Sequence, residues 1–186
     1  IWVTPPRGSK KVQSWLVEEG AMPFHVLCET ERVFAHAAFR EIGIAGFNSI
    51  KKQAADIEKD LIAFLENWTS HGQHLEASFV TKYNRFIIIA VNQEVQQATG
   101  CSIDKSVEFI QSLEQKYKVD LLDKMNVTYK QGEFLTHKSL LDFKRMAKEK
   151  AVSPNTIVFN NLVNTIEEWR ESWEVPAEDS WHSRFF

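Results

Sequence analysis

The chain has 186 residues, 44% of them hydrophobic and 12% aromatic, with 22 basic and 25 acidic residues and a formal net charge of −3. This length suits one domain or two small ones with an apolar core. The charge balance does not favour nucleic acid or an anionic membrane as partner, and no apolar run approaches the ~20 residues of a membrane span.

The two cysteines, Cys28 and Cys101, do not make a disulfide framework, and no secretory signal is visible. We therefore expect a reduced, cytoplasmic protein without a cofactor. Residues 1–45 begin without Met. We expect them to be a leader that is truncated, read through from upstream sequence, or partly foreign to the native protein. Within it, residues 25–28 and 32–34 are short strand candidates, whereas residues 35–38, rich in alanine, equally suit a helix.

Residues 46–122 form the predicted core domain. A polar cap at Asn48 or Ser49 precedes apolar residues that recur at helical spacing, which predicts an amphipathic helix as far as Trp68. Residues 75–83 alternate imperfectly and predict a strand. Residues 85–91 are β-branched and aromatic, so they predict the return strand of a hairpin, buried on both faces.

A short bridge then leads into a second helix, with Ser102 as the expected N-cap and Tyr117 on its buried face. A leader strand before these elements and a strand at residues 127–129 after them would give the order β-α-β-β-α-β. That order is the ferredoxin-like arrangement. The predicted fold class is therefore α+β, with a mainly antiparallel sheet covered by helices.

Residues 123–186 form a predicted small C-terminal α+β module. Strands at residues 125–129 and 134–136 flank Gly132, and Ser139 caps a helix. Another strand at residues 156–159 precedes a final helix that ends near residues 175–176. The tail is too aromatic for a disordered end, and we expect it to pack back onto the body of the protein.

Five segments resemble a small bacterial family of uncharacterised proteins whose members often carry the label "ABC transporter ATPase". The segments are residues 68–72, 85–88, 98–104, 158–163 and 173–176. The resemblance covers about residues 48 to 186 and implies an ATPase component. The chain has no G-x-x-x-x-G-K-[ST] phosphate loop, however, so the residues for that chemistry are not recognised in it.

The C-terminal module also resembles GYF-like modules, which are small peptide-binding domains. The resemblance rests on the layout of residues 129–132, 139–143 and 152–158. It implies interaction with a protein partner. Residues 159–161 depart from the pattern where such modules place an aromatic residue and a more open loop.

The bridge before the second helix is the candidate chemical site. Cys101 near a helix N-terminus is placed where the helix dipole favours a thiolate, which suits a nucleophile. Thr99, Gly100 and Ser102 could bind an anion through backbone amides. The competing interpretation is a simple capping turn with a small packed cysteine, because every helix needs such a cap.

Two spacings could serve a metal, namely His71-x-x-His74 and His25-x-x-Cys28. Further ligands are missing near both pairs, so we expect no metal site. Lysines and Arg145 between residues 138 and 150 form a basic helix face. We interpret that face as solvated rather than as a nucleic-acid surface.

The last fifth of the chain concentrates aromatic residues, and Trp is enriched in binding hot spots. The candidate interaction residues are Trp169, Trp173, Trp181, Phe185 and Phe186. The leading hypothesis is a non-enzymatic interaction or assembly protein. The alternatives are a small thiol-dependent or anion-binding enzyme at Cys101 and an ATPase component. The oligomeric state stays open.

Overall fold

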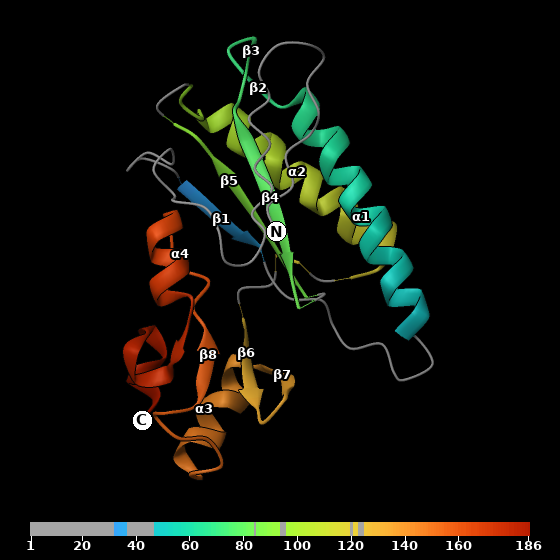
Figure 1. Ribbon diagram of the computed structural model, residues 1–186. Coiled ribbons are helices and arrows are strands. Elements are labelled where there is room, and N and C mark those ends of the chain that lie inside the picture. The colour runs from blue at the N-terminus through green and yellow to red at the C-terminus, as the bar shows by residue number, and fades with distance from the viewer. Residues whose placement is uncertain (1–31, 37–46, 84, 94–95, 120, 123–124) are drawn as a thin grey trace, which may run out of the picture. The chain divides into compact units, whose positions relative to one another are not determined.

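The computed structural model describes residues 32–36, 47–83, 85–93, 96–119, 121–122 and 125–186. The chain divides into two compact units, residues 1–122 and 123–186. Both units combine helices with antiparallel sheets, which confirms the predicted α+β class (Figure 1).

The N-terminal unit contains a three-stranded antiparallel sheet in the order β1-β5-β4. In chain order its main elements are β1 (Arg32–His36), α1 (Phe47–Asn67), β4 (Ala77–Lys82), β5 (Phe86–Val91) and α2 (Gly100–Tyr117). Buried residues of α1 and α2 pack in one cluster with residues of β4 and β5. The two helices therefore cover one face of the sheet (Figure 1).

Strand β5 is central in this sheet, and all six of its residues are buried. Ile87, Ile89 and Val91 join the cluster under the helices. Successive side chains of a strand point to opposite faces, so Phe86 and Ile88 point away from that cluster, and both are at most 1% exposed. The prediction of a return strand buried on both faces is confirmed.

Helix α1 is amphipathic, as its periodicity predicts. From residue 55 on, its buried positions, with the residue that follows the helix, are Ile57, Leu61, Leu65 and Trp68. A two-stranded hairpin, β2 (Thr69–Ser70) with β3 (Gln73–His74), follows directly. His71 and Gly72 between them have φ of 51° and 78°, the positive pair that a type I′ turn requires.

The ferredoxin-like completion is not confirmed. The strand predicted at residues 127–129 exists as β6 (Asn126–Gln131), but β6 pairs with β7 and β8 of the second unit rather than with β1. The predicted leader strand does form, as β1. Because Ala35 and His36 belong to β1, the helical alternative is wrong there. Residues 25–28 lie outside the described part of the chain.

The C-terminal unit contains a four-stranded antiparallel sheet in the order β7-β6-β8-β9. Besides β6, its elements are β7 (Phe134–Ser139), α3 (Leu140–Lys148), β8 (Ile157–Phe159), α4 (Ile166–Ser172), β9 (Glu174–Pro176), η2 (Ala177–Asp179) and η3 (Trp181–Phe185). The predicted last helix is too long, since residues 174–176 form a strand in which Val175 pairs with Val158.

Two local features, a turn and a helix cap, determine the geometry of the β6–β7–α3 segment. Gly132 has φ of 60° in a two-residue turn, which fits the first central position of a type II′ hairpin. Ser139 pairs with Asn126 at the end of β7 and is also the N-cap of α3. Its Oγ accepts a hydrogen bond from the Asp142 N–H at 3.1 Å. Strand and helix therefore share one residue.

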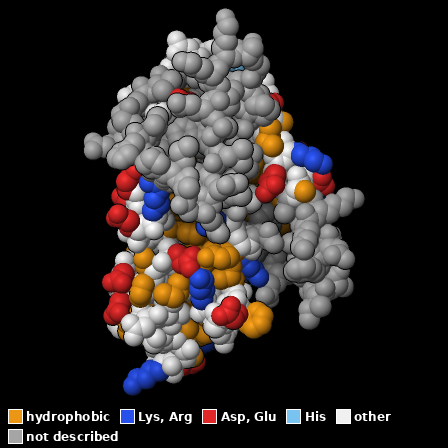
Figure 2. Space-filling model, in the orientation of Figure 1, with side chains coloured by type: hydrophobic (Ala, Val, Ile, Leu, Met, Phe, Trp, Pro, Cys, Tyr) orange, Lys and Arg blue, Asp and Glu red, His pale blue; other side chains and the backbone are white. Residues whose placement is uncertain are grey.

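The core of the C-terminal unit lies between its sheet, α3 and the tail. Its buried residues are Val127, Tyr129, Phe143, Ala147, Val152, Val158 and Ala177. Phe185 packs against this cluster, so the expectation that the tail packs back is confirmed. Outside the core, hydrophobic side chains lie among charged ones on the described surface (Figure 2).

Candidate functional site

The N-terminus of α2 differs from the prediction by three residues. The helix begins at Gly100 with Thr99 as N-cap, so Ser102 is the third helical residue rather than the cap. Ser102 Oγ accepts a hydrogen bond from the Thr99 N–H at 2.8 Å and lies 2.8 Å from the Thr99 carbonyl oxygen, to which it donates. Ser102 thus satisfies the N–H of the N-cap residue, as in a capping box, while the Thr99 carbonyl also accepts the Ile103 N–H at 2.9 Å.

Side chains next to the β2–β3 hairpin fix this helix end. The Trp68 Nε1–H donates to the Ser102 carbonyl oxygen at 2.8 Å, and the Ser70 and Thr99 hydroxyls are 3.2 Å apart. Ser70 and Ser102 are at most 2% exposed. The structure therefore brings Thr99, Gly100 and Ser102 together, but the polar groups of Thr99 and Ser102 bond within the protein.

Cys101 is the second residue of α2, and it is exposed. Its thiol is free. The two side chains that flank it near the helix end, Thr99 and Ser102, take part in the capping bonds. This arrangement places the predicted nucleophile on the surface of a capped helix.

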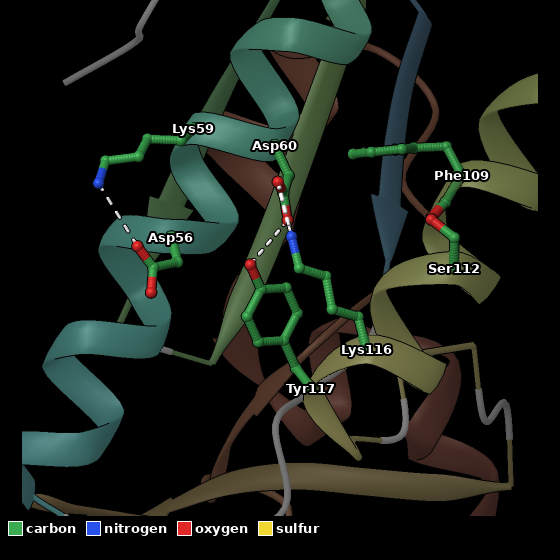
Figure 3. A network of polar contacts seen from close by, with 7 residues as sticks. All are labelled: Asp56, Lys59, Asp60, Phe109, Ser112, Lys116 and Tyr117. Atoms are coloured by element: carbon green, nitrogen blue, oxygen red, sulfur yellow. Dashed lines mark hydrogen bonds and ion pairs between the residues drawn. The ribbon is translucent and has the colours of Figure 1, made fainter.

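A polar network that the sequence analysis missed joins α1 to α2 (Figure 3). Lys116 Nζ donates to both carboxylate oxygens of Asp60, at 2.9 and 2.7 Å, and the Tyr117 hydroxyl donates to Asp60 Oδ2 at 2.7 Å. The feature of the sequence that could have indicated this network is the position of Asp60. It lies three residues after Ile57 and four before Phe64, on the inner side of α1.

The protonation equilibria follow from this geometry. Burial raises the pKa of the Asp60 carboxyl, but the hydrogen bonds from Lys116 and Tyr117 outweigh it and hold that pKa below its ordinary value. The hydrogen bond to Asp60 raises the pKa of Lys116, and burial together with Asp60 raises the pKa of Tyr117. All three shifts favour the bonded state at neutral pH, so the network braces the two helices.

The aromatic residues of the C-terminal unit form two groups. In the first, the rings of Tyr129, His182, Phe185 and Phe186 surround Phe143 at centroid distances of 5.5, 5.9, 6.2 and 6.3 Å. Trp181 stacks on His182 at 3.9 Å, and the Arg184 guanidinium lies 4.6 Å from the Trp181 ring.

The second group lies on the other face of the sheet. Trp173 contacts Phe159 at 4.9 Å and Trp169 at 5.8 Å. Val158 belongs to the core cluster with Tyr129, so its neighbour Phe159 points away from that cluster. The predicted interaction residues Trp169 and Trp173 are therefore separated by the sheet from Trp181, Phe185 and Phe186.

Exposure also divides the predicted interaction residues. Trp173 is 3% exposed and Phe186 is 44% exposed, whereas Trp169, Trp181 and Phe185 are half-buried. Among the described residues, the most exposed large apolar side chains are others, namely Phe134 (76%), Leu141 (75%), Leu162 (63%) and Met125 (61%). The sequence could have indicated these exposed residues, because each is a large apolar residue at a position where a polar one is expected. Phe134, directly after Gly132-Glu133, is an example.

His182 is 1% exposed, and its Nδ1 lies 2.8 Å from Ser180 Oγ. Burial, assisted by the positive charge of Arg184, lowers the pKa of His182 from 6.5 to about 4. The imidazole is therefore neutral in the folded protein at physiological pH. It acts as an aromatic element of the core rather than as an exposed base.

Among the described residues, no group of three or more His, Cys, Asp and Glu side chains could hold a metal ion. His71 and His74 are both exposed and belong to the β2–β3 hairpin. Of the described helices, none combines the length and apolar character needed to cross a membrane.

Comparisons of the chain with protein-family models, with curated proteins and with solved structures give no match. The structure itself therefore defines the class: an α+β protein of two compact units, each with an antiparallel sheet. The family resemblance and the GYF-like resemblance stay predictions from the sequence.

A pair of substitutions tests whether the α2 N-terminus is a cap. Ser102→Ala should lower the free energy of unfolding by about 1 kcal/mol, because both hydrogen bonds of the buried Ser102 hydroxyl to Thr99 are lost. Cys101→Ala should change it by less than about 0.5 kcal/mol, because the side chain is exposed. Urea unfolding of both variants measures the difference. Equal effects would contradict the capping role of Ser102.

A second pair tests the helix brace. Asp60→Ala should cost about 1–2 kcal/mol of unfolding free energy, since three hydrogen bonds to a partly buried carboxylate disappear. Asp56→Ala, the control, breaks only an exposed ion pair with Lys59 and should cost less than about 0.5 kcal/mol. The Asp60 contribution should be fully present above the ordinary carboxyl pKa and should be lost as pH falls from there through the lower pKa of the folded state, because folding lowers the pKa of this carboxyl.

The third prediction concerns pH. The unfolded chain protonates His182 near pH 6.5 and the folded chain only near 4, so the stability present above pH 6.5 is lost as pH falls toward 4. The maximum loss is about 3 kcal/mol, since one pKa unit corresponds to about 1.4 kcal/mol. His182→Gln should flatten the stability curve between pH 7 and 5 in denaturant titrations, whereas His74→Gln should not. Parallel curves for wild type and His182→Gln would refute this prediction.

Proposed function

We propose that this chain is a non-enzymatic protein-interaction protein whose C-terminal unit, residues 123–186, carries the binding surface. One observation carries the proposal. Six large hydrophobic side chains are exposed among the described residues, and all but Tyr83 belong to this unit. The five are Met125, Phe134, Leu141, Leu162 and Phe186.

Exposed apolar side chains of this size are a frequent feature of protein–protein interfaces, because they lose contact with water when a partner covers them. Here they stand on ordered elements: Phe134 begins β7, Leu141 is in the first turn of α3, and Phe186 follows η3. Leu162 lies in a turn where the Asn160 side chain accepts a bond from the Leu162 N–H at 3.2 Å. A pre-ordered surface loses less conformational entropy on binding.

The half-buried aromatic tail supports the same function. The Arg184 guanidinium lies 4.6 Å from the Trp181 ring and 5.4 Å from the Phe185 ring. Trp and Arg are the residues most enriched in binding hot spots, and packing of this kind holds them in place before a partner arrives. We therefore include Trp181, Phe185 and Phe186 among the residues of the proposed surface.

The same proposal covers the kind of partner and the compartment. The formal net charge of −3 favours a protein over nucleic acid as partner. An exposed free thiol at Cys101 suits a reducing compartment, and we therefore place the protein in the cytoplasm.

Site-specific photocrosslinking in a lysate of the native host tests the proposal. A benzophenone amino acid at position 134 or 186 of the full chain should capture a discrete partner, because these side chains would lie inside the interface. The same probe at Tyr83, which is 45% exposed in the N-terminal unit, is the matched control. Capture at position 83 equal to that at 134 and 186, or no capture at either, would count against the proposal.

A further inference from the structure

The residues that anchor helices α3 and α4 lie on opposite faces of the C-terminal sheet. Helix α3 contacts β6 and β7, and its Phe143 shares the core cluster with Val158 of β8. The next residue of β8, Phe159, points to the other face, where its ring contacts Trp173 at the end of α4. The sheet therefore separates the outer surfaces of the two helices.

The outer surface of α3 is cationic and carries one large apolar side chain. Phe143 and Ala147 face the core. Leu141, Lys144 and Lys148 follow at steps of three and four residues away from the core, and all three are exposed. We call these three exposed residues the α3 face.

The charge of the α3 face is not neutralised by the described part of the chain. No ion pair joins Lys144 or Lys148 to another described residue, whereas Arg145 between them is paired with Asp142 at 2.8 Å. The helix dipole favours Lys148, which lies in the last turn. It gives no such advantage to Lys144 in the middle of the helix, and like charges four residues apart repel each other.

The outer surface of α4 carries a pair of opposite charge. Ile166 and Trp173 are at most 3% exposed and mark its inner side. Glu167 and Glu171 are exposed, and neither side chain makes an ion pair or hydrogen bond with another described residue. We call these two residues the α4 face. Glu171 lies in the last turn, where the helix dipole disfavours a negative charge.

Apolar surface accompanies both faces. Leu141 belongs to the α3 face and is 75% exposed. Leu162 is 63% exposed in the turn that leads into α4. Two hydrogen bonds hold that turn, because Asn160 Oδ1 accepts from the Leu162 N–H at 3.2 Å and Asn164 Nδ2 donates to the Leu162 carbonyl at 3.0 Å. Each charged pair therefore has one ordered leucine near it.

We infer that the α3 face of one copy of this chain binds the α4 face of a second copy. The two lysines of the α3 face pair with the two glutamates of the α4 face. Both pairs span four residues, about 6 Å along a helix axis, so their spacings match. The two leucines add apolar area beside the charges. This inference rests on the proposed function, because it names one partner of the C-terminal unit.

A second copy is the occupant that the charges of the chain themselves supply. The sheet keeps the two faces apart within one unit, so they can neutralise each other only between copies. A different anionic partner would use the α3 face alone and would leave the unfavourable position of Glu171 unexplained. Since each contact leaves one face of each kind unused, further copies add head to tail beyond a dimer.

Sedimentation velocity of the purified full chain tests for this association. Two short helices bury less area than a standard interface of about 1,600 Å², so the contact is weak, and its ion pairs are screened by salt. At low salt the sedimentation coefficient should rise with protein concentration and should not level off at a dimer. At about 0.5 M salt the chain should be monomeric.

Two results of this measurement would overturn the inference. A monomer at every concentration up to about 0.5 mM in low salt would place the dissociation constant well above that range. Association that stops at a dimer would contradict head-to-tail contact between two separate faces.

Charge-swapped variants locate the contact. Lys144→Glu with Lys148→Glu makes both faces acidic, and Glu167→Lys with Glu171→Lys makes both faces basic. Each double variant alone should associate at least about tenfold more weakly than the wild type, because like charges then meet. An equimolar mixture of the two should recover the wild-type affinity within about threefold, because every contact again joins opposite charges. A mixture as weak as either variant alone would refute the assigned faces.

A control pair separates the local contact from the net charge. Lys105→Glu with Lys118→Glu makes the same change of net charge as the lysine variant of the α3 face, on exposed residues of the N-terminal unit. It should change the affinity less than about twofold, since these charges lie outside the contact. Circular dichroism confirms that each variant is folded. A loss equal to that of the α3-face variant would contradict the inference.

The outcomes separate this inference from the proposed function. A monomeric chain that still captures another protein through position 134 or 186 would reject the second copy and keep the interaction role. A monomeric chain without capture would reject both. Association that follows the charge-swap pattern, without capture of another protein, would keep the contact between copies and reject the wider partner role.

Discussion

The burial of β5 on both faces is the constraint on which the N-terminal unit depends. A strand of Phe, Ile, Ala and Val with no side chain in water can exist only as the centre of a sheet, so β1 and β4 take its two edges. Ile87 and Ile89 then need a cover, which α1 and α2 supply. The Asp60 network and the cap at Thr99 hold those helices in register with the sheet. The polar features of this unit therefore serve its packing.

The small size of the C-terminal unit limits how much apolar surface it can bury. A unit this small has a high ratio of surface to volume, so its core cannot enclose every aromatic ring that the sequence supplies. The ring of Phe143, at the centre of the core, contacts the rings of Tyr129, His182 and Phe185. Phe159 and Trp173 pack against each other on the opposite face of the sheet. The apolar side chains left over, such as Phe134 and Leu141, stay at the surface. They are the basis of the interaction role that we propose.

The sequence predicts the elements whose pattern is local. The periodicity of α1 and the β-branched run of β5 are examples, as is the glycine turn before Phe134. Features decided by distant partners were missed. The cap of α2 is Thr99 rather than Ser102 because Trp68 and Ser70 bond to that turn. Residues 174–176 leave the predicted helix because Val175 pairs with Val158. The split of the aromatic group depends on which face of the sheet each ring meets, and spacing does not encode that.

Ser139 limits how far strand β7 can shift relative to β6 and α3. Ser139 is both the last residue of the β6–β7 ladder and the N-cap of α3, so no loop residue separates the strand from the helix. A slip of β7 by one residue would unseat the helix and would also turn Phe134 and Lys138 to the opposite face. The two-residue turn at Gly132 fixes the register at the other end of β7. The side chains of β7 are therefore held in one fixed alternation between the two faces of the sheet.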